Sequence, residues 1–91
     1  METPEVFRND EPGYVSWLER HERGFVLNLW PVGSSQVPML HSARCMHIYY
    51  PEVTYTHTVK RPKACSEDRV TLERWAHKQG YSFKLCSSCD L

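Results

Sequence analysis

The feature that most constrains this chain is the pair Cys86-Ser87-Ser88-Cys89, a CxxC motif near the end of the sequence. Two thiolates separated by two residues can bind one metal ion while the intervening backbone N–H groups hydrogen-bond to sulfur. Redox-active CxxC pairs share this spacing, but they lie at the start of a helix inside a βαβ unit. No helix is expected after residue 86. The pair therefore predicts a metal site.

The length of the chain favours such a site. A domain of 91 residues, 41% of them hydrophobic, can bury only a modest core, so a structural metal would add needed stability. No apolar run approaches the roughly 20 residues that a membrane span requires, and the acidic, proline-containing start lacks the features of a signal peptide. We therefore expect a cytoplasmic protein, in which metal binding explains four cysteines better than disulfides do.

Tetrahedral zinc needs two more ligands, and spacing alone leaves several candidates open. His41 and Cys45 have the separation of two side chains on one turn of a helix. Cys45 and His47 would instead share one face of a strand. A site of four cysteines, with both histidines free, is a further alternative. Cys65 stands alone before an expected helix, a position where cysteine is often a small buried apolar residue.

Two helices are expected from patterning and end signals. The first runs from about residue 12 to 23 and ends at Gly24, with an apolar face of Val15, Leu18 and Trp17. The second is capped by Ser66 or Asp68, runs to about Gln79, and buries Leu72, Trp75 and Ala76. Gly80 suits the left-handed position just after a helix.

The remaining pattern predicts strands, and with them an α+β fold. We expect a small, mostly antiparallel sheet with one or two helices and a structural zinc site. Residues 1–12 are expected to form a flexible arm, and residues 13–91 a single zinc-binding domain. Strands are expected at 25–30, 47–50, 53–59 and 81–85, with the first of them central because both of its faces are apolar, and a basic turn at 60–63.

The segments LHSARC and LERWAHKQGYSFKLCSSC resemble the Ada-type metal-binding domain. That family has a His or Cys, three residues, a Cys, then a helix, a Gly-aromatic pair and a terminal CxxC. The resemblance covers residues 39–89, although the segment between Cys45 and Cys86 is longer than the usual family pattern and residues 1–38 have no recognised counterpart. It implies zinc held by His41, Cys45, Cys86 and Cys89, joining a β region to the C-terminal knuckle.

The residue at position 41 separates this chain from the DNA-repair members of the family. In those members the first ligand is a Cys that accepts a methyl group from a DNA phosphate, whereas this chain has His41. The resemblance then implies a structural zinc module without methyl transfer. It also implies an accessory role in DNA modification, restriction or repair. Neither an HExxH motif nor a deaminase pattern is present, so we do not expect an enzyme.

A basic and aromatic segment agrees with a nucleic-acid partner. Residues 36–63 carry four basic side chains and one acidic side chain. Lys60, Arg61 and Lys63 would bind phosphates, and Tyr55 would stack on a base. The plainer interpretation is a solvated turn beside ordinary strand tyrosines. The alternative function is a zinc-stabilised adaptor that binds a protein and no nucleic acid.

Overall fold

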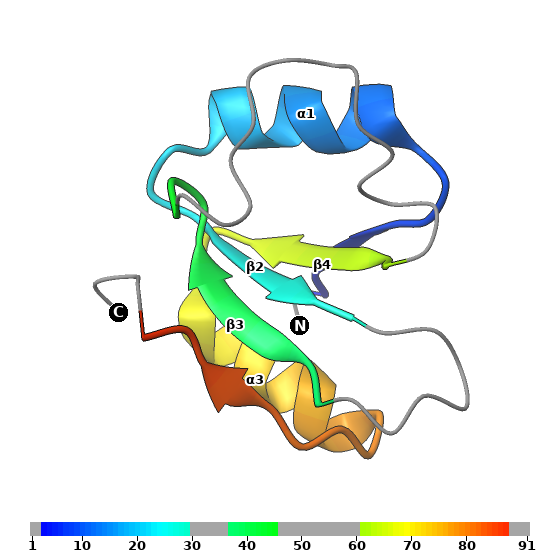
Figure 1. The fold of residues 1–91 in the computed structure, drawn as a ribbon, viewed down its shortest axis with the longest axis vertical. Helices are drawn as coiled ribbons and strands as arrows, with labels where there is room; N and C mark the ends of the chain where they lie inside the picture. The colour runs from blue at the N-terminus through cyan, green and yellow to red at the C-terminus, as the bar shows by residue number, and fades with distance from the viewer. Residues whose placement is uncertain (1–2, 30–36, 46–60, 88–91) are drawn as a thin grey trace.

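The computed structural model describes residues 3–29, 37–45 and 61–87 of the chain. Within these residues a five-stranded sheet lies between two helices, α1 above it and α3 below it in Figure 1. The expected α+β class is confirmed. The strands are β1 (Glu5–Phe7), β2 (Phe25–Asn28), β3 (Met39–Ser42), β4 (Lys63–Ser66) and β5 (Lys84–Leu85); the helices are α1 (Glu11–Arg20) and α3 (Arg69–Lys78).

The sheet is mixed, with the strand order β1-β4-β2-β3-β5. Every neighbouring pair is antiparallel except β3 and β5, which run parallel. The prediction of a mostly antiparallel sheet is thus confirmed. The segment 25–28 is the central strand β2, as its two apolar faces predict. The strands expected at 47–50 and 53–59 lie outside the described residues.

The central strand divides the core into two parts. Val26 points to the face of the sheet covered by α1, and Leu27 points to the face covered by α3. We refer to these as the α1 face and the α3 face. On the α1 face the core contains Phe7, Tyr14, Trp17, Leu18, Val26, Ala43, Cys45, Cys65 and Cys86. On the α3 face it contains Leu27, Leu29, Leu40, Ala64, Leu72 and Ala76.

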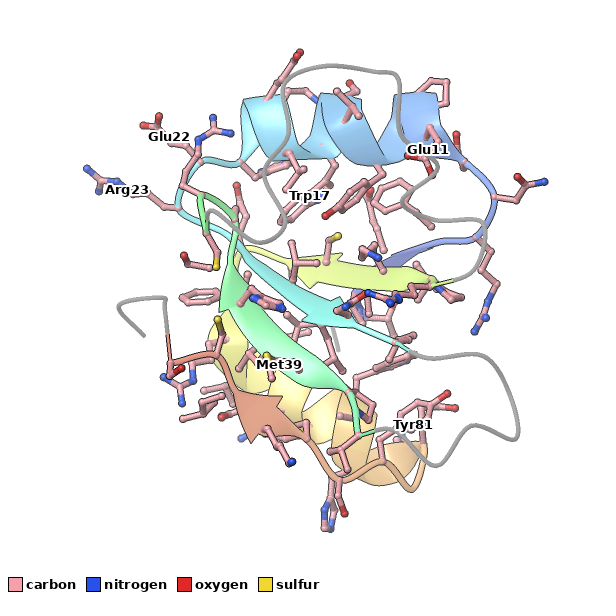
Figure 2. The ribbon with its side chains drawn as sticks, in the orientation of Figure 1. Glu11, Trp17, Glu22, Arg23, Met39 and Tyr81 are labelled. Atoms are coloured by element: carbon pink, nitrogen blue, oxygen red, sulfur yellow. The ribbon has the colours of Figure 1, made fainter. Side chains whose placement is uncertain are left out.

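Helix α1 begins and ends slightly earlier than its pattern predicts. Asp10 caps its start, where the carboxylate accepts a hydrogen bond from the backbone N–H of Gly13 at 3.1 Å. The helix ends at Arg20. Gly24, which the sequence suggested as the end signal, lies after the helix in the turn that leads into β2. A side chain at Gly24 would lie 2.5 Å from the Trp17 ring, so glycine is needed there for packing. In Figure 2, Trp17 points from α1 toward the sheet.

Helix α3 has the ends that the sequence predicts. Of the two expected caps, Asp68 is the residue that accepts from the backbone N–H of Val70, at 3.2 Å. At the other end Gly80 has a φ of 81°. The backbone N–H groups of Gly80 and Tyr81 donate to the carbonyls of His77 and Ala76, at 3.0 and 2.9 Å. This double closure is a Schellman motif, and it directs the chain back along the sheet toward β5.

Two strands differ from the sequence-based expectation. Residues 5–7 pair with β4 as β1 and bury Phe7, where we expected a loose arm. Residues 63–66 form β4 between β1 and β2, where we expected the end of a basic turn and an isolated cysteine. Short strands such as these depend on their neighbours in the sheet more than on their own composition. No helix in the described part of the chain is long and apolar enough to cross a membrane.

Candidate metal centre

Strand β3 positions the histidine. His41 pairs with Val26 of β2, and directly paired residues point to the same face, so the imidazole lies on the α1 face. Its exposed fraction is only 4%. The burial of this imidazole is compatible with a role as a metal ligand, for which its spacing from Cys45 made it a candidate.

A tight turn brings Cys45 back toward this histidine. The backbone N–H of Cys45 donates to the carbonyl of Ser42 at 3.0 Å, the hydrogen bond that closes a β-turn. Just before it, the N–H of Ala43 donates to the carbonyl of Gly24 at 2.8 Å and anchors the turn to β2. The spacing between His41 and Cys45 is therefore closed by a strand and a turn, and not by the helical turn that this spacing also fits.

The third side chain arrives through the parallel strand β5. Lys84 and Leu85 pair with Met39 and Leu40 of β3. The ladder continues one step further, because the backbone N–H of Cys86 donates to the carbonyl of Leu40 at 2.9 Å. Cys86 is thereby held next to β3. In Figure 1 the chain reaches this point by running back beneath β3 after α3.

The three side chains converge on one buried point. The ligand atoms of His41, Cys45 and Cys86 all lie within 4.8 Å of one another, and each residue is buried. The two sulfur atoms are 3.8 Å apart. Two thiolates bound at about 2.3 Å to a tetrahedral zinc ion would also be about 3.8 Å apart. The cluster could therefore hold a metal ion in its present geometry. In the described parts of the chain no other group of His, Cys, Asp or Glu does so.

Cys65 does not join this cluster. The pairings place Cys65, Val26 and His41 in one row across β4, β2 and β3. Two strand spacings, about 10 Å, separate the first from the last of them. Burial raises the pKa of the Cys65 thiol far above its usual value, although the nearby Lys63 charge acts in the opposite direction. Cys65 is thus a buried, protonated thiol, as expected of an isolated cysteine.

Most of the other predicted site residues lie where the structure cannot test their roles. Cys89 and His47 lie outside the described residues, as do Lys60 and Tyr55. Arg61 is exposed. Their roles therefore stay predictions.

Lys63 differs from the expectation of a phosphate contact, because it is buried with an exposed fraction of 4%. Its Nζ donates to Asn28 Oδ1 and to the carbonyl of Arg61, both at 2.7 Å, and lies 5.9 Å from the centre of the Tyr14 ring. Desolvation lowers its pKa to about 8. The sequence predicted a basic turn at 60–63, whereas Lys63 is the first residue of β4.

Fold and site together define a small α+β domain with a buried His-Cys-Cys group able to hold a metal ion. Comparison with protein-family models, curated proteins and solved structures finds no match. The resemblance to the Ada-type domain therefore depends on the short motifs and on the convergence of three of their four ligand positions.

Proposed function

We propose that this chain is a structural zinc module, in which zinc bound to His41, Cys45, Cys86 and Cys89 holds β3 and β5 together. The convergence of three buried donor atoms within 4.8 Å carries this proposal. One imidazole and several thiolates suit zinc, whereas magnesium and calcium prefer oxygen ligands. Cys89 would supply the fourth ligand from the same CxxC knuckle.

A structural role is favoured over a catalytic one by the burial of the site. A catalytic zinc keeps one coordination position open for water or substrate, whereas a structural zinc has four protein ligands. The exposed fractions of His41, Cys45 and Cys86 are 4%, 3% and 6%. The metal would fasten β5, which has only two residues in the sheet, to the rest of the domain.

Metal analysis of the purified chain tests this proposal. We expect one zinc ion per chain, measured by mass spectrometry under native conditions, and its loss in His41→Ala and Cys86→Ala. Cys65→Ala is the matched control, because it removes an equally buried thiol outside the cluster and should keep the metal. Full zinc occupancy in both ligand variants would rule out the proposed ligand set.

For the partner we propose DNA, in an accessory role in modification, restriction or repair. The motif resemblance and the exposed Arg61 beside Lys60 in the sequence support this. Lys63 is not included, because its ammonium group is already bonded inside the protein. The double variant Lys60→Gln, Arg61→Gln should weaken salt-dependent DNA binding, and Lys78→Gln on the exposed side of α3 should not. Absence of DNA binding at low salt would favour the alternative, a protein-binding adaptor.

A further inference from the structure

A second concave site lies away from the metal cluster, where the end of α1 meets β1 and β4. It is an open pocket of about 180 Å³. Most of its wall is formed by Trp17 of α1, by His21 just after this helix, by Glu5 of β1, and by Cys65 and Glu67 around the end of β4. No lysine or arginine is among the lining residues. The pocket is thus concave and acidic.

One wall is fixed by packing and by a hydrogen bond. His21 Nδ1 lies 2.5 Å from Glu67 Oε1, and the imidazole is stacked on the Trp17 ring with centroids 4.6 Å apart. Trp17 is itself held by Gly24, which approaches it too closely to admit a side chain. The Trp17–His21 part of the wall is therefore held in place by packing, which lowers the entropy cost of binding a ligand there.

The polar groups of this pocket are mainly hydrogen-bond acceptors. Two carboxylates, Glu5 and Glu67, carry negative charge. Glu67 Oε1 is paired with His21 Nδ1, and the second carboxylate oxygen of Glu67 can accept from a ligand. Cys65 is 1% exposed; its backbone is paired in the sheet, but its thiol makes no hydrogen bond to any described residue, and the sulfur of this protonated thiol is a weak acceptor. A fitting ligand therefore has to be a cation with several donors and a flat surface.

We propose that this pocket binds an arginine side chain presented by a partner protein. A guanidinium group offers five N–H donors in a plane, pairs with carboxylates in a forked geometry and stacks on aromatic rings. Glu5 and Glu67 provide the charge, and the partly exposed His21 ring, which packs against the buried Trp17, provides the aromatic surface. The pocket volume of about 180 Å³ suits one such side chain and excludes a helix or a strand.

Binding of short peptides to the full, zinc-loaded chain tests this inference. The probe is acetyl-Ala-Arg-Ala-amide, and its norleucine counterpart lacks only the guanidinium. In amide nuclear magnetic resonance spectra we expect the arginine peptide, but not the norleucine peptide, to shift the signals of Glu5 and of residues 65–67. Glu5→Gln and Glu67→Gln should each weaken binding by about two- to fivefold, the effect of one partly exposed ion pair.

Glu19→Gln is the matched control. Glu19 is exposed on α1 and does not line the pocket, so this variant removes the same charge and should leave the affinity unchanged. Equal shifts with the norleucine peptide would overturn the inference. Equal weakening by Glu19→Gln would also overturn it, since binding would then follow the overall charge of the chain.

Discussion

The described part of the chain contains three buried cysteines in two different surroundings. Cys45 and Cys86 have sulfur atoms 3.8 Å apart and share their site with a buried imidazole. Cys65 lies on the same face of the sheet and is just as buried, yet among the described residues it belongs to no group of ligand atoms close enough to hold a metal ion. The two surroundings show that burial alone does not bring a cysteine into a group that could hold a metal ion.

Backbone geometry makes the difference between them. Cys45 and Cys86 each lie just beyond the end of a strand, where a turn or a last ladder hydrogen bond directs the side chain toward its neighbours. Cys65 lies inside β4, with Val26 between it and His41. A regular strand position keeps its side chain one strand spacing from the next, whereas a strand end allows closer approach.

The largest expected effect is the difference in stability and metal content between replacing a thiol of the metal cluster with serine and replacing the Cys65 thiol with serine. Cys45→Ser should remove the metal and abolish the cooperative unfolding transition, because structural zinc supplies about 10 kcal/mol or more of apparent binding free energy in small domains. Cys65→Ser should keep the metal and lower the free energy of unfolding by only about 1–3 kcal/mol, the cost of a buried hydroxyl without a partner. Urea denaturation with and without a chelator measures both.

The chelator sharpens this comparison. It should destabilise the unmodified chain and Cys65→Ser to the same extent, and should leave Cys45→Ser unchanged. If Cys65→Ser became insensitive to chelation, Cys65 would have to take part in metal binding.

The second largest effect concerns Lys63, which lies on the same face of β4 as Cys65. The titration of Lys63 tests whether water reaches this buried region. The pKa of Lys63 is lowered to about 8 by burial, whereas the unfolded chain has a lysine pKa of about 10.4. Between these values the unfolded chain binds more protons, so the free energy of unfolding should rise with pH. The rise attributable to Lys63 is up to about 3 kcal/mol between about pH 8 and pH 10.4.

Lys63→Met provides the reference for that measurement. Urea denaturation over the same pH range should show a flatter profile for this variant, and the difference between the two profiles isolates Lys63. Parallel profiles would mean that water reaches the ammonium group, and that the surroundings of Cys65 are wetter than its burial indicates.

The smallest effect concerns the approach to the metal cluster. Gly80→Ala should cost about 1 kcal/mol because of the φ of 81°, although an added Cβ meets nothing within 4 Å. Gly80→Asn should cost less, since asparagine tolerates this conformation better. Thermal unfolding measures the cost, and zinc content should stay the same in both variants. Loss of zinc from Gly80→Asn would show that the turn controls ligand placement more strongly than we infer.

Much of the fold and of the site follows from local signals in the sequence. Helix α3 was predicted from its cap and its terminal glycine, and β2 from its two apolar faces. The resemblance to the Ada-type domain implied a ligand set that includes His41, Cys45 and Cys86, which the structure brings together, whereas the H-x3-C and CxxC spacings alone left other ligands open. The helix end and the central strand depend on residues close together in the chain, whereas the approach of Cys86 to His41 and Cys45 depends on the pairing of β5 with β3.

The features that the sequence did not reveal depend on distant residues. Strand β1 has three residues and exists because β4 pairs with it. Lys63 looked like a surface lysine, and its burial is made tolerable in part by Asn28 and the Tyr14 ring, both remote in sequence. The choice between a helical turn and a β-turn after His41 likewise depends on Gly24, seventeen positions before it, whose carbonyl anchors Ala43.

The number of residues between Gly80 and Cys86 fixes the position of the Cys86 thiol relative to β3. After the Schellman turn at Gly80, Lys84 and Leu85 pair in parallel with β3, and Cys86 occupies the next position. Because side chains alternate along a strand, one residue inserted between Gly80 and Cys86 would turn the sulfur away from His41, and two would move it about 7 Å along β3. Homologous chains that keep the metal should therefore hold this interval constant, even where the segment between Cys45 and β4 changes in length.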